Sequence, residues 1–140
     1  EQILENITRP AKFRVLPDHT FRQNDPAVVG VEVLSGELRR NVNVVKWDGT
    51  DAKRIGRLKS LQDAGEDVDS ARTGEQLAAS IDGPTVGRQI EEGDDLWVEI
   101  PEKHAKILEQ ELKEEISVDE REALSMYLEK HRNRDPFWGK

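Results

Sequence analysis

The feature that most constrains the fold is an alternation of apolar and polar residues, repeated in short runs between Ala11 and Pro101. Successive side chains of a β-strand point to opposite faces, so a period of two predicts a strand with one buried face. The apolar members of five runs are Phe13 and Val15; Val29, Val31 and Val33; Val42 and Val44; Leu77, Ala79 and Ile81; and Leu96, Val98 and Ile100. A sixth run, from Lys53 to Gln62, is irregular, and we expect a β-bulge there at Gly56.

Turn residues separate these runs. They are Ser35-Gly36, Asp48-Gly49, Ala64-Gly65, Asp82-Gly83-Pro84 and Glu92-Gly93-Asp94. An Asp-Gly dipeptide between two strands is a strong hairpin signal. Short strands at this spacing predict a small antiparallel barrel or sandwich. We interpret residues 10–101 as a β-barrel.

The period becomes helical after Pro101. The sequence predicts helices over residues 102–114 and 118–132, the first with Ile107, Leu108 and Leu112 along one stripe. Ser117 and Glu120 are spaced as a capping box at the start of the second helix. Leu124, Tyr127, Leu128 and His131 then follow at helical spacing. Residues 102–140 are therefore predicted to form a helical hairpin and a tail.

The first nine residues are predicted to be a connector. Ile3, Leu4 and Ile7 have helical spacing, and Pro10 ends the pattern. Because the first residue is Glu1 and not Met, we expect this chain to be cut from a longer protein. The connector would then be the end of a helix that arrives from upstream.

The charge is negative overall but unevenly distributed. The formal net charge is −8, yet residues 1–62 contain 11 Lys and Arg against 8 Asp and Glu. Residues 63–140 contain 10 Lys and Arg against 21 Asp and Glu. A polyanion would find the first half more favourable than the second, although chance segregation on a solvated surface remains an alternative. The acidic excess also fits a protein from a salt-adapted organism.

Composition excludes several classes of site. The chain has no cysteine, which rules out disulfides and thiolate metal sites and favours a cytoplasmic location. No apolar run approaches the roughly 20 residues of a membrane helix, and no secretory signal is visible. We therefore expect no membrane partner, and we expect a monomer.

The sequence carries no motif of nucleotide hydrolysis or nucleophilic catalysis. A phosphate-binding G-x-x-x-x-G-K-[ST] loop, a G-x-G-x-x-G loop and a G-x-S-x-G elbow are all absent. His19, His104 and His131 lack metal-ligand spacing, and the latter two are expected on exposed or half-buried helix faces. Carboxylate pairs such as Asp94-Asp95 are interpreted as solvated faces. We predict no catalytic residue and no metal site.

Binding remains as the function to which the residues point. Lys12 and Arg14 share one strand face, as do Arg57 and Lys59, and such pairs suit contacts to nucleic-acid phosphates. Ordinary exposed strand faces are an equally good interpretation. The barrel segments hold four aromatic residues, Phe13, Phe21, Trp47 and Trp97, and we assign most of them to the core, which argues against a continuous stacking platform.

Several phrases of the sequence resemble one known family. They are "RPAKFRVLP", "FRQNDPAVVGVEVLSGELR", "IGRLKSLQDAGEDVDSARTGEQLAASIDG", "VGRQIEEGDDLWVEIPEKHAKIL" and the closing "RDPFWG". In this order they resemble the C-terminal domain, domain IV, of archaeal and eukaryotic translation initiation factor 5B, the counterpart of bacterial initiation factor 2. The resemblance runs from about Asn6 to the end of the chain.

The resemblance implies a fold and a set of partners. The fold is mostly β, a small closed antiparallel barrel of the kind found as domain two in elongation factors, followed by two C-terminal α-helices. The intact factor resembles a ribosome-dependent GTPase whose GTP and Mg²⁺ lie in other domains, so no cofactor is expected in this chain. The partners implied are the aminoacyl acceptor end of initiator methionyl-tRNA, the C-terminal tail of initiation factor 1A and the ribosome.

The resemblance also places candidate contact residues. In bacterial relatives the acceptor-end site uses a Lys-Arg-aromatic stretch and a Gly-Tyr-Glu-Cys-Gly stretch, whose places here are residues 62–64 and 74–78 without the basic, aromatic and cysteine side chains. The candidates for tRNA binding are Lys12, Arg14, Lys59, Gln62, Asp63, Gly65 and Gln76. The candidates for binding factor 1A are Leu112, Leu124, Tyr127, Leu128, Phe137 and Trp138, although packing within the domain is the commoner role for such helix residues.

Three classes of function remain open at this point. The first is a non-catalytic module that binds the tRNA acceptor end and an initiation factor. The second is a protein-docking module only, with RNA contacts made by other domains. The third is an independent enzyme, which would need a pocket with a buried titratable pair.

Overall fold

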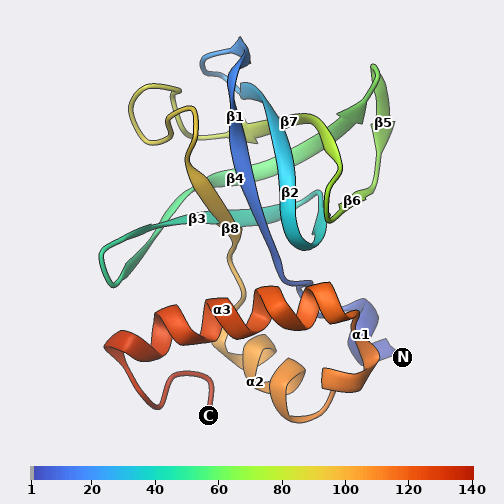
Figure 1. The fold of residues 1–140 in the computed structure, drawn as a ribbon, viewed down its shortest axis with the longest axis vertical. Helices are drawn as coiled ribbons and strands as arrows, with labels where there is room; N and C mark the ends of the chain where they lie inside the picture. The colour runs from blue at the N-terminus through green and yellow to red at the C-terminus, as the bar shows by residue number, and fades with distance from the viewer. Residues whose placement is uncertain (1) are drawn as a thin grey trace.

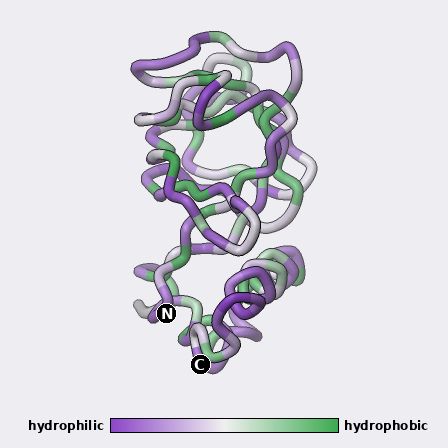
Figure 2. Tube along the Cα trace, turned by 90° about the vertical axis from the view of Figure 1, so that its left-hand side faces the viewer, coloured by the Kyte–Doolittle hydropathy of each residue, from purple (hydrophilic) through white to green (hydrophobic). Residues whose placement is uncertain are grey.

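The computed structural model describes residues 2–140 as a barrel that stands on a layer of helices (Figure 1). In chain order the elements are α1 (Gln2–Glu5), β1 (Ala11–Arg22), β2 (Ala27–Arg39), β3 (Val42–Asp48), β4 (Asp51–Asp63), β5 (Glu66–Val68), β6 (Ser70–Arg72), β7 (Gln76–Asp82), β8 (Asp95–Val98), α2 (Glu102–Gln110), the 3₁₀ turn η1 (Lys113–Glu115) and α3 (Val118–Arg134). The side view in Figure 2 shows the strands as a ring above the helices. Glu1, the first residue of the predicted connector, lies outside the described residues.

The barrel is closed and antiparallel, as predicted. The strands pair in the order β1-β8-β3-β4-β7-β2, and the pairing of β1 with β2 completes the ring. The short strands β5 and β6 add to β4 and β2 outside this ring. Closure leaves the six ring strands without a free edge, so their backbone groups pair within the domain.

The inward residues of all six ring strands form one core. It contains the predicted alternating residues of β1 and β2, together with Ala79 and Ile81 of β7 and Leu96 and Val98 of β8; Leu77 is partly buried and packs against it. Leu58 and Leu61 supply the contribution of β4. Burial thus confirms the period-two interpretation for the regular runs. In the sixth run the buried residues Leu58 and Leu61 are three apart, with a register shift between Leu58 and Ser60, so its alternation is broken as predicted.

The structure corrects one predicted turn. Ser35 and Gly36 do not end a strand, because β2 continues through them to Arg39. The pairing of β1 with β2 slips by one residue here, so the pair forms a bulge that bends the strand without reversing it. Gly36 has φ +99°, and a Cβ on it would lie 2.2 Å from the carbonyl oxygen of Pro10, so the position requires glycine.

The helical layer follows the prediction except at the two helix C-termini, and α3 ends at Arg134 and not at residue 132. Helix α2 ends at Gln110 and not at residue 114, and the 3₁₀ turn η1 follows it. The capping box at the start of α3 is present: the Ser117 hydroxyl accepts from the N–H of Glu120, and the Glu120 carboxylate accepts from the N–H of Ser117. This reciprocal pair satisfies two backbone donors at the helix start.

A second apolar core joins the helices to the barrel. It contains Ile7, Val45, Trp97, Ile100, Ala105, Leu108, Ile116, Leu124, Tyr127 and Leu128. Ile100, predicted as a strand residue, lies two positions beyond β8 and belongs to this second core. The hydroxyl of Tyr127 accepts from the N–H of Ile100 at 3.1 Å and donates to its carbonyl oxygen at 3.4 Å. Burial raises the pKa of Tyr127 to about 12, so the phenol stays a neutral donor.

His131 lies in an aromatic cluster beneath the barrel. Its ring stacks on Trp138 with centroids 3.7 Å apart and meets Trp47 and Tyr127 edge to face. Its Nε2 atom is buried and has no partner among the described residues. Burial lowers the pKa of His131 below its usual value, against the opposing effect of Glu102 and Glu99.

Replacing His131 by Phe should therefore remove a pH dependence without loss of stability at neutral pH. Because the pKa of His131 is lower in the folded than in the unfolded protein, the fold is fully stable with respect to this titration above the usual pKa of 6.5. The free energy of unfolding then decreases as pH falls through the folded pKa. His131→Phe keeps the aromatic contact and removes the unpartnered nitrogen. Urea unfolding at a series of pH values from neutral to acidic measures both effects. If the stability of His131→Phe fell between neutral and acidic pH as steeply as that of the parent, this role of His131 would be contradicted.

Candidate functional site

A cleft of about 330 Å³ opens on the outer surface of the barrel. Its wall is apolar at Leu16, Phe21, Leu77 and Ala78, and its polar side chains are His19, Gln62, Asp63 and Gln76. Gly30, Ala64 and Gly65 complete the lining. The tip of the β4–β5 hairpin and the far half of β1 lie in the part of the barrel away from the helices (Figure 1).

One side of the cleft is formed by an outward bulge of β1. Val15 pairs with Val31 and Thr20 pairs with Val29, so residues 16–19 stand opposite Gly30 alone. A Cβ on Gly30 would lie 2.8 Å from the Cβ of His19, so the missing side chain gives the bulge its room. The bulge brings Leu16 and His19 to the cleft, and Phe21 follows on the strand.

Glu92 holds this bulge from the loop before β8. Its carboxylate accepts from the N–H of Asp18 at 3.1 Å and from the hydroxyl of Thr20 at 2.8 Å. These two hydrogen bonds lower the pKa of Glu92, because they stabilise its ionised form. His19 Nδ1 donates to the carbonyl oxygen of Pro17 at 2.7 Å, and Nε2 is then the acceptor of the neutral ring.

The facing side is the tight hairpin between β4 and β5. Asp63 pairs with Glu66, and the two residues between them, Ala64 and Gly65, have φ +53° and +84°. Two positive values define the turn whose twist suits a two-residue hairpin. The side-chain amide of Gln62 donates to Asp67 at 3.1 Å, which orients it along the hairpin. The predicted turn at Ala64-Gly65 is confirmed.

The third side comes from β7. Gln76, Leu77 and Ala78 pair with Glu32, Val31 and Gly30 of β2, which places β7 beside the bulge. The amide of Gln76 donates to Glu32 at 3.3 Å. The cleft thus combines an apolar wall with amide, imidazole and carboxylate groups. Such a lining suits a small ligand with an apolar part, hydrogen-bonding groups and a positive charge.

The structure brings together most of the predicted tRNA-binding residues. Gln62, Asp63, Gly65 and Gln76, which come from two separate stretches, all line the cleft. Lys59 is exposed three residues upstream on β4, about 10 Å away along the strand. Its ammonium group has no ion-pair partner within residues 2–140.

Lys12 and Arg14 lie elsewhere on the barrel. Both carry ion pairs to Asp95 of β8, with nitrogen–oxygen distances of 3.7 Å for Lys12 and 2.7 Å for Arg14. The Lys12 ammonium also lies 5.0 Å from the centroid of the Trp97 ring. Neither residue lines the cleft, so the structure separates the predicted tRNA-binding set into two surfaces.

The predicted factor-binding residues separate in the same way. Leu124 and Leu128 are buried, but they also form the floor of a groove of about 320 Å³ on the helical layer. Its rim is charged and consists of Glu109, Lys113, Arg121, Glu129 and Arg132. Leu112, at the start of η1, is half-buried and packs against the second core.

The remaining predicted factor-binding residues lie outside the groove. Tyr127 is 2% exposed, lies inside the second core and does not line the groove. Phe137 is 77% exposed. Trp138 is half-buried and stacks on His131, so it holds the tail against α3.

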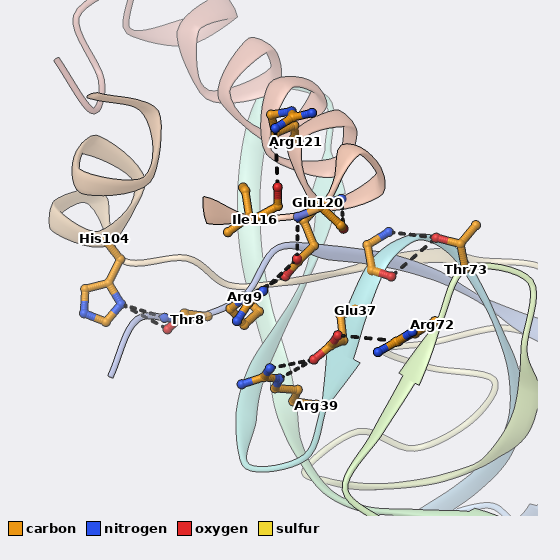
Figure 3. Close-up of polar contacts among 12 residues, drawn as sticks. Thr8, Arg9, Glu37, Arg39, Arg72, Thr73, His104, Ile116, Glu120 and Arg121 are labelled. Atoms are coloured by element: carbon orange, nitrogen blue, oxygen red, sulfur yellow. Dashed lines mark hydrogen bonds and ion pairs between the residues drawn. The ribbon is translucent and has the colours of Figure 1, made fainter. Parts of the chain in front are cut away.

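An ion pair ties the connector to α3 (Figure 3). The guanidinium of Arg9 donates to both oxygens of Glu120, at 2.6 and 2.7 Å. The Glu120 side chain is 2% exposed, and that of Arg9 is 13% exposed. Burial alone would raise the pKa of Glu120, but the hydrogen bonds from Arg9 and Ser117 lower it below its usual value. Thr8 adds a contact from its N–H to His104 Nδ1 at 3.1 Å.

Sequence reasoning missed the apolar half of the cleft. Phe21, assigned with the other barrel aromatics mostly to the core, is 65% exposed. The sequence did carry a signal, because Phe21 is isolated among polar residues. Apart from Pro17, it is the single apolar residue between Leu16 and Pro26. A large apolar residue isolated in a polar run is a candidate for a surface contact.

Neither a metal site nor a membrane span is found in the part of the chain that the structure describes. No three His, Asp or Glu side chains among residues 2–140 converge as metal ligands would. No helix in the same range is long and apolar enough to cross a membrane.

Comparison with known proteins identifies the barrel. Residues 9–97 match the sequence model of the family described as elongation factor Tu domain 4. The whole chain is 84% identical to part of a "Probable translation initiation factor IF-2" from Haloarcula marismortui and 75% identical to one from Natronomonas pharaonis. One from Methanosarcina mazei is 48% identical over the same 140 residues. The chain spans about a quarter of these relatives, 23% of each.

A solved structure shows the same fold. The GDP-bound aIF5B of Aeropyrum pernix superposes with a TM-score of 0.88 at 36% sequence identity. The superposition covers 99% of this chain and 23% of the Aeropyrum protein. The matched unit therefore includes the C-terminal helices as well as the barrel.

Proposed function

The chain belongs to the elongation factor Tu domain 4 family and corresponds to the C-terminal domain of archaeal initiation factor 5B, also called IF-2; we propose that it is a non-catalytic, cytoplasmic binding module of a translation initiation GTPase. Its ligand is the aminoacyl acceptor end of initiator methionyl-tRNA, which it holds during joining of the ribosomal subunits. The observation that carries this proposal is the cleft, because it joins Gln62, Asp63, Gly65 and Gln76 to an apolar wall.

The chemistry of the cleft matches that ligand. An unbranched thioether side chain is apolar and would pack against Leu16, Leu77 and the ring of Phe21. The amides of Gln62 and Gln76 would hydrogen-bond the ribose or the ester. Asp63 would attract the free α-amino group, against repulsion between this carboxylate and the nearby phosphates. Lys59, free of carboxylate partners within residues 2–140, would contact the RNA backbone.

A second site would take the C-terminal tail of initiation factor 1A. The groove between α2 and α3 supports this, because it has an apolar floor at Leu124 and Leu128 and a charged rim. A peptide with apolar anchors and flanking charges would fit such a groove. Phe137, exposed on the tail that follows α3, is a candidate for contacts beside it.

The alternative is a protein-docking module whose parent protein contacts RNA through other domains. The chain is acidic overall, with a formal net charge of −8, so its isolated affinity for RNA is expected to be low. Binding of an acceptor-end mimic in the cleft separates the two functions, because a docking module would leave the cleft unused.

Phe21→Ala should weaken binding of an aminoacylated acceptor-end mimic by at least about fivefold. Truncating an aromatic that stacks on a base or packs on an apolar side chain costs on the order of 1–3 kcal/mol. Phe137→Ala is the matched control, because Phe137 is similarly exposed but lies on the C-terminal tail. Isothermal titration with a stable amide-linked methionyl-adenosine oligonucleotide measures both variants.

Gln62→Ala and Lys59→Ala extend the same test to the polar side. Each should weaken the mimic severalfold, and Lys59→Ala should also reduce the salt dependence of binding. If Phe21→Ala, Gln62→Ala and Lys59→Ala all bind as tightly as the control, the cleft is not the acceptor-end site.

A further inference from the structure

A second surface, formed by the barrel and α3, gathers six of the 21 Lys and Arg residues of this acidic chain. Two adjoining pockets, of about 390 and 250 Å³, share Lys46 and Trp47 in their linings. Six cations line them, namely Lys12, Lys46, Lys53, Arg54, Arg88 and Lys130. The only carboxylates in the two linings are Asp48 and Asp95. We call this the Trp47 surface.

The Trp47 surface lies far from the cleft. Arg54 lines it near the start of β4, and Gln62 lines the cleft near the end of the same strand. Eight residues of strand separate them, which is about 26 Å. In Figure 1 the β3–β4 and β4–β5 hairpins project on opposite sides of the barrel. One nucleotide cannot occupy both sites, so the Trp47 surface is a separate site.

The strand register places like charges directly opposite each other. Lys46 of β3 pairs with Lys53 of β4, and Val45 pairs with Arg54. Facing lysines on adjacent strands repel each other and lower the stability of the sheet unless anions lie beside them. Carboxylates relieve part of this repulsion. Lys46 forms an ion pair with Asp94 at 2.7 Å, and Lys53 forms one with Asp48 at 2.9 Å.

Two cations of the surface, Arg88 and Lys130, have no ion pair within the described residues. Lys12 is in a longer pair, with its ammonium 3.7 Å from Asp95. Lys130 lies 5.8 and 6.0 Å from the ring centroids of Trp47 and Trp97. An indole ring holds an ammonium group in place without neutralising it. Lys53 and Arg54 are exposed in their pairs with Asp48 and Glu99, and such pairs are weak, so a phosphate can share these two cations; the Lys46–Asp94 pair is half-buried.

We propose that the Trp47 surface binds the phosphodiester backbone of RNA, independently of the acceptor-end cleft. Ammonium groups fixed on three strands and a helix suit phosphate contacts, which position a nucleic acid without reading its sequence. The acidic remainder of the chain repels RNA, so this surface also sets the orientation in which the domain can approach it.

The test compares two triple variants that change the net charge equally. The surface variant carries Lys53→Gln, Arg88→Gln and Lys130→Gln, and the control carries Lys103→Gln, Lys106→Gln and Lys140→Gln, three exposed lysines outside the surface. The probe is a blunt-ended RNA hairpin with no aminoacyl group and no single-stranded 3′ end. Fluorescence anisotropy over a KCl series gives the affinity and its salt slope, and circular dichroism checks that each variant is folded.

The surface variant should bind the hairpin at least about tenfold more weakly, with a salt slope smaller by about 2–3. The control variant and Phe21→Ala should stay within about twofold of the parent. Equal losses in the two triple variants would reduce the effect to net charge and overturn the proposal. It would also be overturned if an oligo-glutamate of equal charge displaced the hairpin as well as RNA does. Either failure leaves the proposed function of the cleft unaffected, because that proposal is tested separately with the aminoacylated mimic.

Discussion

Arg9→Met is expected to lower the free energy of unfolding by about 3–5 kcal/mol, because it leaves the carboxylate of Glu120 buried and unpaired. Glu120 is 2% exposed, and it would retain only the hydrogen bond from the Ser117 N–H. Methionine keeps most of the volume of the Arg9 side chain, so the loss reports the charge and not a cavity. Urea unfolding of the parent and the variant measures it.

An exposed ion pair provides the control for this prediction. Arg40 pairs with Asp69 at 2.9 Å, but the two side chains are 46% and 87% exposed, so Arg40→Met should cost at most about 1 kcal/mol. The double variant of Arg9→Met with Glu120→Gln should recover part of the loss, because the neutral amide is cheaper to bury. Equal costs for Arg9→Met and Arg40→Met would show that the buried pair does not fasten the connector to α3.

The same ion pair has a defined pH dependence. The hydrogen bonds to Glu120 overcome the effect of burial and hold its folded pKa below the usual value of 4.5. A lowered folded pKa gives a stability contribution that is present above pH 4.5 and is lost as pH falls below that value through the folded pKa. The stability difference between the parent and Arg9→Met should therefore shrink in that acidic window.

Gly56→Ala is expected to cost about 3 kcal/mol, the upper part of the range for overpacking. A Cβ on Gly56 would lie 2.2 Å from the carbonyl oxygen of Asp82 and 2.7 Å from Pro84 Cδ. Two stretches of backbone would have to move apart, and β4 and β7 would lose part of their pairing. Thermal or urea unfolding reports the loss.

Gly49→Ala separates this contact from the general effect of adding a side chain. Gly49 has φ +62° in the β3–β4 turn, and a Cβ there would meet no atom within 4 Å. Its replacement should cost only the strain of that conformation, about 1–2 kcal/mol. If Gly56→Ala were no more destabilising than Gly49→Ala, the close approach of β4 to the end of β7 would not matter for stability.

Period and turn chemistry predicted most of the barrel from local pattern. Phe13, Val31 and Ile81 are buried because they occupy alternate positions on strands that turn one face to the core. The alternation in the sequence therefore predicts their burial. The turn predicted at Ser35-Gly36 was wrong, because a glycine with positive φ also occurs within a paired strand where another backbone approaches closely. Here the Pro10 carbonyl lies against Gly36 and accepts from the N–H of Glu37, a contact between residues distant in sequence that a local pattern does not show.

The candidate site was predictable only where the family resemblance supplied it. Gln62 and Gln76 came from matching stretches, and the structure places both in one cleft. Leu16 and His19 could not be predicted, because a bulge of four residues opposite one shows no periodic signal. The Arg9–Glu120 ion pair could not be predicted either. The capping-box spacing accounts for Glu120 locally and does not indicate a second partner distant in sequence.

The central claim is that the cleft between the β1 bulge, the β4–β5 hairpin and β7 holds the aminoacyl acceptor end. An amide NMR titration of this chain with a methionylated acceptor-end mimic, and separately with a C-terminal peptide of initiation factor 1A, tests it most directly. We predict that the mimic shifts the amides of residues 59–65 and 76–78, and that the peptide shifts those of α2 and α3. Shifts in the helices alone, with the cleft unchanged at saturating mimic, would contradict the claim and leave a protein-docking module.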